Sequence, residues 1–181
     1  MDAGVTASYW YVDPPFATAG MTMNIRPAKA ADEPGLGDLG ALLVTLHHQF
    51  DADRFLAPTP GTPASYGRFL VSQIGREDVL VLVAEEAGRV CGYVYAGLEG
   101  DDWMMLRGPA GVIYDLVVDP TRRGEGLGRR LLDEALSFLE NQGAPRIVLS
   151  TADQNHAAQS LFAAAGFRRT MVEMTRQPRR P

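Results

Sequence analysis

The sequence contains 181 residues, of which 46% are hydrophobic and 22% are charged. These values are ordinary for one globular domain, and they exclude a chain that is disordered throughout. The 17 basic and 22 acidic residues give a net charge of −5, so we expect no binding to nucleic acid or to an anionic membrane. Cys91 is the only cysteine, which excludes an internal disulfide, and we expect no metal site.

Residues 1–22 differ in composition from the rest of the chain, because aromatic residues alternate there with prolines without a lasting periodicity. We expect a peripheral or disordered extension at 1–22, a folded domain at 23–176 and a short tail at 177–181. No apolar run approaches the roughly 20 residues that a membrane helix needs. No lysine or arginine precedes Arg26, so the charged start of a signal peptide is absent, and the expected location is the cytoplasm.

Periodicity predicts the elements of the first half of the domain. After Asp32, which can cap a helix, leucines recur at helical spacing from Leu36 to Leu46. Three glycines between residues 35 and 40 weaken this helix. The expected elements are a strand at 24–28, a helix that follows Asp32, a loop at 47–63, a helix at 64–74, and a hairpin of strands at 79–86 and 89–98.

The second half contains the clearest helical pattern of the chain. Leu127, Leu131 and Ala135 share one face of a helix at 127–141, which Gly143 helps to end. The expected elements are a loop at 97–111, a strand at 112–118, the helix at 127–141, a strand at 146–151, a helix at 155–165 and a closing strand at 167–176. Strands and helices do not alternate strictly, so the predicted fold class is α+β around one mixed sheet.

A glycine-rich segment joins the strand at 112–118 to the helix at 127–141. Gly124, Gly126 and Gly128 allow a ligand to approach the backbone, and we expect them to adopt positive φ angles. The free N–H groups of the first helical turn point to the same place, where the helix dipole favours an anion. Four arginines and one glutamate give the segment a local charge of +3: Arg122, Arg123, Glu125, Arg129 and Arg130. A pyrophosphate suits this site, and the alternative is a turn before a helix with a solvated arginine face.

Two motifs resemble those of the GNAT superfamily of acetyl-CoA-dependent N-acetyltransferases. The first, Arg123-Gly-Glu-Gly126-Leu-Gly128, is similar to the family signature Arg/Gln-x-x-Gly-x-Gly/Ala. The second, Asn155-x-x-Ala158-x-x-x-Phe162-x-x-x-Gly166-Phe167, is similar to the family ending Asn…Ala…Tyr…Gly-Phe. The resemblance implies the GNAT acyltransferase fold, a mixed and mostly antiparallel sheet with flanking helices. It also implies that the sheet splays between the strands at 112–118 and 146–151, where acetyl-CoA binds.

The resemblance also implies which residues bind acetyl-CoA. Backbone groups of Leu116 and Val118 would pair with the pantetheine arm as an added strand does. The N–H groups implied for the pyrophosphate are those of Gly124, Glu125, Gly126, Leu127, Gly128 and Arg129. The other implied cofactor-binding residues are Val117, Arg123, Asn155 and Phe162. For Asn155 the alternative is a helix N-cap.

The implied reaction is direct attack of a primary amine, on a small molecule or a peptide, on the thioester. A backbone N–H near Val118 would polarise the carbonyl group. Asp115 would be the base that removes the ammonium proton, and the alternative is a structural carboxylate. Phe162 lies where many relatives have a tyrosine as general acid, and a ring without a hydroxyl cannot donate a proton. Water would then protonate the thiolate.

Two expectations concern the acceptor. His47 could be a base in an acceptor site, or part of an exposed loop. Arg107 would suit an acceptor carboxylate, and the alternative is a loop that packs its own apolar residues. A non-catalytic acyl-CoA-binding or regulatory domain remains open as a function, as does a phosphate-binding module without CoA. The resemblance also makes a homodimer an expectation.

Overall fold

The computed structural model describes residues 23–178, so our expectations for residues 1–22 and for the last three residues of the tail lie outside the described part of the chain. The elements in chain order are β1 (Asn24–Pro27), the 3-10 helix η1 (Ala30–Asp32), α1 (Glu33–Phe50), α2 (Thr62–Gln73), β2 (Val79–Glu86), β3 (Arg89–Glu99), β4 (Ala110–Val118), the 3-10 helix η2 (Pro120–Arg122), α3 (Leu127–Asn141), β5 (Ile147–Leu149) and α4 (His156–Ala164). Within residues 23–178, no helix has both the length and the apolar composition that a bilayer crossing needs.

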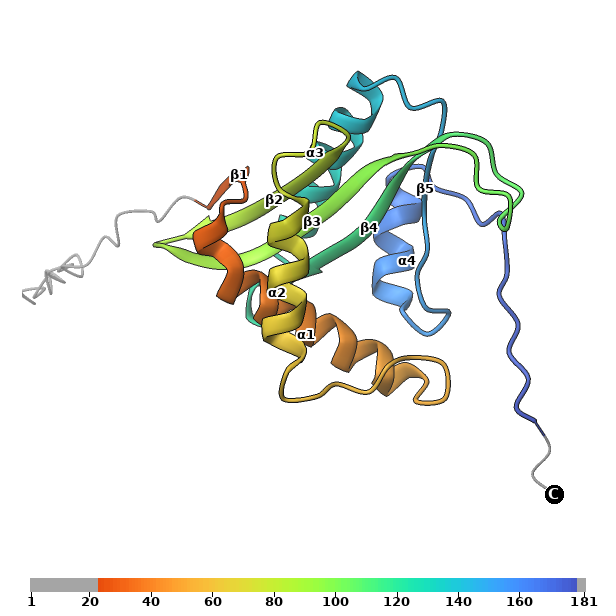
Figure 1. The fold of residues 1–181 in the computed structure, drawn as a ribbon, viewed down its shortest axis with the longest axis horizontal. Coiled ribbons are helices and arrows are strands. Elements are labelled where there is room, and N and C mark those ends of the chain that lie inside the picture. The colour runs from red at the N-terminus through yellow and green to blue at the C-terminus, as the bar shows by residue number, and fades with distance from the viewer. Residues whose placement is uncertain (1–22, 179–181) are drawn as a thin grey trace, which may run out of the picture.

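The five strands form one sheet in the order β1-β2-β3-β4-β5 (Figure 1). The first four strands are antiparallel neighbours, whereas β5 runs parallel to β4. Pairing with β5 involves only residues 111–113 of β4. Among the described residues, 115–118 pair with β3 alone and Tyr114 pairs with neither strand, so the sheet opens between β4 and β5. The expected α+β fold, with a mixed and mostly antiparallel sheet that splays at this point, is confirmed.

Helices cover both faces of the sheet (Figure 1), and each face has its own hydrophobic core. On one face, Leu131 of α3 and Phe162 of α4 belong to the same buried cluster as Ile113 of β4. On the other face, Leu70 of α2 belongs to a cluster with Tyr93 of β3 and with residues of α1. The apolar face predicted for the helix at 127–141 is the face that α3 buries.

α1 and α2 approach each other closely because glycines remove side chains from their interface. A Cβ atom at Gly37 would lie 2.3 Å from the carbonyl oxygen of Pro63. A Cβ atom at Gly67 would lie 2.5 Å from the carbonyl oxygen of Glu33. Both distances are far inside van der Waals contact, so alanine at either position would force the helices apart. The glycines that lower the helical propensity of α1 thus permit its packing against α2.

Two expected loops are shorter in the structure than the sequence predicts. α1 continues to Phe50, so His47 lies on the helix and not in a loop at 47–63. The loop expected at 97–111 is reduced because β3 extends to Glu99 and β4 begins at Ala110. Between these strands, the backbones of Asp102 and Arg107 exchange two hydrogen bonds and extend the hairpin. In the segment 97–111, the turn-forming residues predicted a loop, but pairing between β3 and β4 extends both strands into it.

The closing strand predicted at 167–176 is wrong. The N–H of Phe167 donates to the carbonyl oxygen of Phe162 at 3.0 Å, and residues 168–178 are exposed and belong to no helix or strand. The β-branched residues Thr170, Val172 and Thr175 favour extended backbone there. A strand, however, needs a partner for its backbone groups, and β5 contributes only three residues, which pair with β4.

Candidate active site

A β-bulge in β4 turns Asp115 toward α1 and α2. In the pairing with β3, Ala96 is opposite Ile113 and Tyr95 is opposite Asp115, so Tyr114 is an extra residue. Side chains alternate between the two faces of a regular strand, and an extra residue reverses this alternation beyond it. Ile113 consequently packs in the core beneath α3, whereas Asp115 forms hydrogen bonds on the opposite face.

Two tyrosine hydroxyls donate hydrogen bonds to the same carboxylate oxygen of Asp115. The Oη of Tyr66 on α2 lies 2.7 Å from Oδ2, and the Oη of Tyr93 on β3 lies 3.1 Å from it. Burial raises the pKa of Asp115 above its usual value, and the two hydrogen bonds and the nearby His47 oppose this rise. A carboxylate whose pKa is raised is better matched to proton abstraction near neutral pH. The sequence contains no motif that points to either tyrosine.

On the edge of β4 that faces the opening, backbone groups have no hydrogen-bond partner among residues 23–178. The N–H of Asp119 donates to the carbonyl oxygen of Cys91 on β3 at 2.8 Å. Hydrogen-bonded and non-hydrogen-bonded pairs alternate along an antiparallel ladder, so the backbone of Val117 also points to β3. The backbone groups of Leu116 and Val118 therefore point toward the opening. The side chain of Val117 is buried in the core with α1 and α2.

The glycine-rich segment leads from β4 into α3. Gly124 and Gly126 have φ angles of 83° and 76°, which favour glycine, and Gly126 is the N-cap of α3. Gly128 does not have the expected positive φ, because it is already the second residue of the helix. Within residues 23–178, the backbone N–H groups of Leu127, Gly128 and Arg129 find no acceptor. Such N–H groups at a helix N-terminus are suited to bind an anion.

The start of α3 lies beside both β4 and α4. A Cβ atom at Gly128 would lie 3.5 Å from Cδ2 of Leu161 on α4 and 3.7 Å from Cγ2 of Val118 on β4. The unpaired edge of β4 and the glycine-rich segment therefore adjoin each other. We call this place the β4 opening, and we define it by the backbone of residues 116–118, the segment 124–129 and Leu161.

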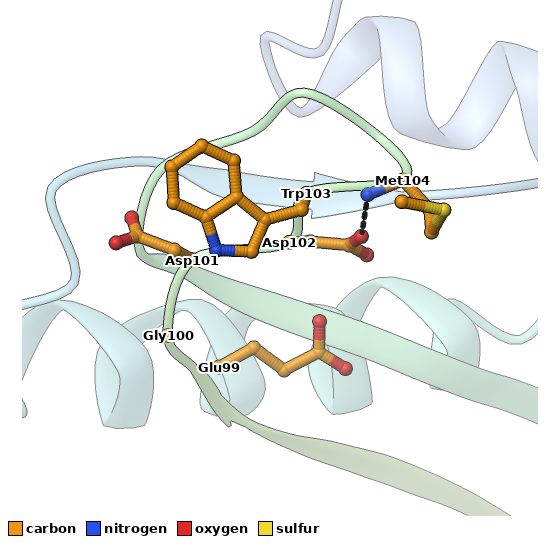
Figure 2. A pocket seen from close by; sticks show the side chains of 6 residues that line it. All are labelled: Glu99, Gly100, Asp101, Asp102, Trp103 and Met104. Atoms are coloured by element: carbon orange, nitrogen blue, oxygen red, sulfur yellow. Dashed lines mark hydrogen bonds between the residues drawn. The ribbon is translucent and has the colours of Figure 1, made fainter.

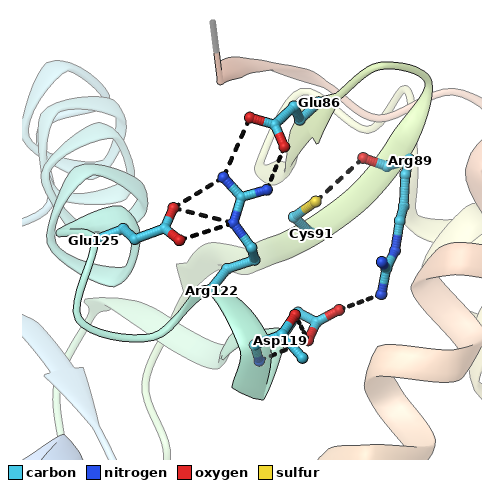
Figure 3. Close-up of polar contacts among 7 residues, drawn as sticks. Glu86, Arg89, Cys91, Asp119, Arg122 and Glu125 are labelled. Atoms are coloured by element: carbon cyan, nitrogen blue, oxygen red, sulfur yellow. Dashed lines mark hydrogen bonds and ion pairs between the residues drawn. The ribbon is translucent and has the colours of Figure 1, made fainter. Parts of the chain in front are cut away.

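Two of the four arginines of the glycine-rich segment form ion pairs with acidic residues. Arg122 forms ion pairs with Glu86 at the end of β2 and with Glu125 (Figure 3), and both carboxylates raise the pKa of its guanidinium. Arg129 pairs with an aspartate one turn further along α3. Arg123 is exposed and forms no ion pair with any residue from 23 to 178. Arg130 is also exposed and forms no ion pair within this range, but its guanidinium donates to the carbonyl oxygen of Met23 at 3.3 Å. Arg123 is thus the arginine of this segment that is most available to a ligand.

Asn155 and Phe162 both have structural roles in α4. The Oδ1 of Asn155 accepts a hydrogen bond from the N–H of Ala158 at 3.3 Å, so Asn155 is the N-cap of the helix. Phe162 is buried in the core shared with α3. Its ring makes an edge-on contact with Phe167, with the ring centroids 6.0 Å apart. Phe162 therefore fills space at the position where the family resemblance implies a tyrosine in many relatives.

The tip of the β3–β4 hairpin forms an open, acidic hollow of about 500 Å³. Figure 2 shows the indole of Trp103 at this hollow, together with the carboxylates of Glu99, Asp101 and Asp102. Arg107 forms an ion pair with Glu99, and its guanidinium lies 3.9 Å from a carboxylate oxygen of Asp102. Arg107 is therefore engaged by carboxylates of its own hairpin. The alternative of a loop that packs its own apolar residues is not found, because Trp103 and Met104 are 78% and 88% exposed.

Known proteins resemble this chain in sequence over most of the domain. Residues 45–167 match the acetyltransferase (GNAT) family. YhfO of Bacillus subtilis (strain 168), an uncharacterized N-acetyltransferase, is 30% identical over 146 residues, which are 80% of this chain and 89% of that protein. A mycothiol acetyltransferase of Thermobispora bispora is 38% identical over 96 residues, which are 51% of this chain. This match spans only 31% of the length of the mycothiol acetyltransferase.

Solved structures share the fold. The aminoglycoside N-acetyltransferase AAC(6′)-Iy in complex with CoA superposes with a TM-score of 0.65, over 91% of this chain and 99% of that chain. Its sequence identity is 17%, so this likeness concerns the fold alone. The family match covers more than half of the chain and includes β4, the glycine-rich segment and α4. The chain therefore belongs to the GNAT family of acetyltransferases.

Proposed function

We propose that this protein transfers an acetyl group from acetyl-CoA to a primary amine of a small molecule. The observation that carries the proposal is the β4 opening, where unpaired backbone groups of a strand adjoin unpaired N–H groups of a helix N-terminus. An amide-containing arm can pair with the strand edge, and a pyrophosphate can bind the helix N-terminus. CoA contains both groups, and an acetyltransferase of the same fold was solved in complex with CoA.

The proposed cofactor contacts follow the parts of CoA. The backbone of Leu116 and Val118 would pair with the pantetheine arm. The N–H groups from Gly124 to Arg129 would donate to the pyrophosphate, and the exposed Arg123 would add a positive charge. Capping of α4 uses only the Oδ1 of Asn155, so the side-chain N–H groups of this residue are available to the ligand.

The chain provides a base and a carbonyl-polarising group for the reaction. Acetyl-CoA supplies the acetyl group as a reactive thioester. Asp115 would take a proton from the acceptor ammonium, directly or through water, and so produce a neutral amine that can attack. The N–H of Val118 would polarise the thioester carbonyl. Water would protonate the leaving thiolate, since Phe162 has no hydroxyl and a thiol pKa of about 8.5 makes the thiolate a tolerable leaving group.

The charge near the hairpin favours a cationic acceptor. Glu99, Asp101 and Asp102 line the hollow at the hairpin tip, and the hydroxyl of Tyr114, next to Asp115, donates to Glu99 at 2.9 Å. Arg107 neutralises one of the three carboxylates through its ion pair with Glu99, and the remaining negative charge attracts ammonium groups from solution. Among the similar proteins, one is named an aminoglycoside N-acetyltransferase and another a mycothiol acetyltransferase. We therefore propose amine-bearing small molecules as acceptors, with peptide amines as the alternative.

An amine panel tests this function. The protein is incubated with acetyl-CoA and polyamines, amino sugars or short peptides, and released thiol and product masses are measured. We expect one amine class to gain one acetyl group in step with thiol release. Binding of CoA in calorimetry without acetylation of any amine would favour a non-catalytic acyl-CoA-binding domain. Absence of CoA binding would contradict the proposal as a whole.

A further inference from the structure

Tyr66 and Tyr93 occupy one oxygen of Asp115 and leave the other without a hydrogen bond from any residue between 23 and 178. Tyr93 is fully buried on the neighbouring strand, so the register of the sheet fixes its position. Tyr66 belongs to α2 and lies 49 residues before Asp115. The hydrogen bond from Tyr66 therefore depends on how α2 is placed against the sheet.

Gly40 of α1 provides the space for the ring of Tyr66. A Cβ atom at Gly40 would lie 2.2 Å from Cδ1 of this ring, so a side chain there would displace it. Phe69 makes an edge-on contact with the same ring, with the centroids 6.3 Å apart. The ring is thus confined between α1 and its own helix, and its hydroxyl reaches Oδ2 of Asp115 at 2.7 Å.

We propose that Tyr66 is a positioning residue for acetyl transfer, which holds Oδ2 of Asp115 so that Oδ1 is the oxygen that takes the ammonium proton. This inference rests on the role proposed above for Asp115. The proton passes from the ammonium nitrogen to Oδ1 and leaves a neutral amine and a neutral carboxylic acid, so no further reactant is needed. Tyr66 keeps its own proton, because burial and the neighbouring Asp115 raise the pKa of its hydroxyl.

Two other titratable groups near Asp115, Tyr95 and His47, form no hydrogen bond with its carboxylate. Tyr95 of β3 faces the same side, but its hydroxyl lies 3.5 Å from Gln73 and does not bond Asp115. His47 of α1 is close enough to act on the charge of Asp115, while its Nδ1 lies 2.9 Å from the carbonyl oxygen of Leu43. Loss of a hydroxyl that bonds the carboxylate should raise the pKa of Asp115, because the bond favours the charged form.

The first test measures the titration of Asp115 without any ligand. Tyr66→Phe removes the hydroxyl and keeps the ring, and Tyr95→Phe is the matched control on the same face. Carbon-13 NMR of labelled aspartate carboxyls gives the midpoint, and Asp115→Asn identifies the signal. We expect the midpoint to rise by about one pH unit in Tyr66→Phe and to stay unchanged in Tyr95→Phe. An unchanged midpoint in folded Tyr66→Phe would overturn the proposal.

The second test separates this inference from the proposed function. With acetyl-CoA and an amine identified in the panel, the acid limb of kcat/KM should shift in Tyr66→Phe as far as the NMR midpoint. Gly40→Ala, checked for folding by thermal denaturation, should produce the same direction of shift. Full turnover in Asp115→Asn would show that Asp115 is not the base, and this would contradict the proposed mechanism. Loss of turnover in Asp115→Asn with an unmoved acid limb in Tyr66→Phe would overturn the positioning role alone.

Discussion

Ile113 and Asp115 are two residues apart on β4, yet their side chains lie on opposite faces of the sheet. Tyr114, the extra residue between them, also follows the last residue of β4 that pairs with β5. The bulge turns the carboxylate toward α1 and α2 at the point where the pairing of β4 with β5 ends. Bulges are frequent next to active sites because they redirect side chains in this way.

The glycine-rich segment can be tested with two glycines of the same conformation. Gly126 and Gly143 have φ angles of 76° and 77°, at the two ends of α3, and a Cβ atom would meet nothing within 4 Å at either. Valine causes similar backbone strain at both positions. We expect Gly126→Val to weaken CoA binding at least about tenfold, or about 1.4 kcal/mol, because its side chain obstructs the pyrophosphate.

Calorimetry with CoA on both folded variants provides the measurement. Gly143→Val should bind CoA as the wild type does, since it lies at the far end of α3. Equal affinities of the two variants would mean that the glycine-rich segment is not part of the binding site.

Phe162 should contribute packing and not proton transfer. The side chain is buried in the core beneath α3 and α4, so Phe162→Leu should lower the free energy of unfolding by about 1 kcal/mol. We expect the single-turnover rate of acetyl transfer to remain near the wild-type value, because no proton donor is lost. A large loss of this rate in a variant that still folds and binds CoA with unchanged affinity would instead indicate that the ring positions the thioester.

The ion pair between Arg26 and Asp32 should make stability depend on pH. Two guanidinium nitrogens of Arg26 donate to Asp32 at 2.8 Å each, and the N–H of Lys29 adds a third bond. Asp32 is only 6% exposed, and its bond to Arg26 is the main reason that its pKa is lowered in the folded protein. A lowered carboxyl pKa stabilises the fold above the unfolded pKa of about 3.9, and this stabilisation is lost as the pH falls through the folded value.

Urea denaturation at several pH values measures this dependence. We expect Asp32→Asn to lose about 2 kcal/mol at pH 7, and the difference from the wild type should shrink below about pH 4. Asp78→Asn is the control, because the pair of Asp78 with Arg76 is 46% and 52% exposed and should matter little. A difference for Asp32→Asn that does not change with pH would contradict the ionic origin.

Local chemistry made part of this structure predictable. The helix at 127–141 has the expected bounds and buries the expected face. Its signals are local in the sequence, because the apolar residues recur at helical spacing and glycines lie at both ends. Asp115 lies on the expected strand for the same reason. The cap at Asn155 follows a local preference as well.

Long-range packing determined what the sequence did not indicate. The hydrogen bond between Tyr66 and Asp115 requires the close approach of α1 and α2 and a one-residue shift in the pairing of β3 with β4. A hydrophobic pattern does not encode either of these. The wrong strand at 167–176 has a related cause, since a segment with strand propensity forms a strand only beside a partner edge.

The measurement closest to the central claim is the rate of acetyl transfer in Asp115→Asn. Asparagine keeps the shape of the side chain and can still accept the two tyrosine hydrogen bonds, but it cannot take a proton. We predict unchanged affinity for CoA in calorimetry and a fall of roughly 10²-fold in the single-turnover rate. A rate within a few-fold of the wild type would contradict the account, because Asp115 would then be a structural carboxylate.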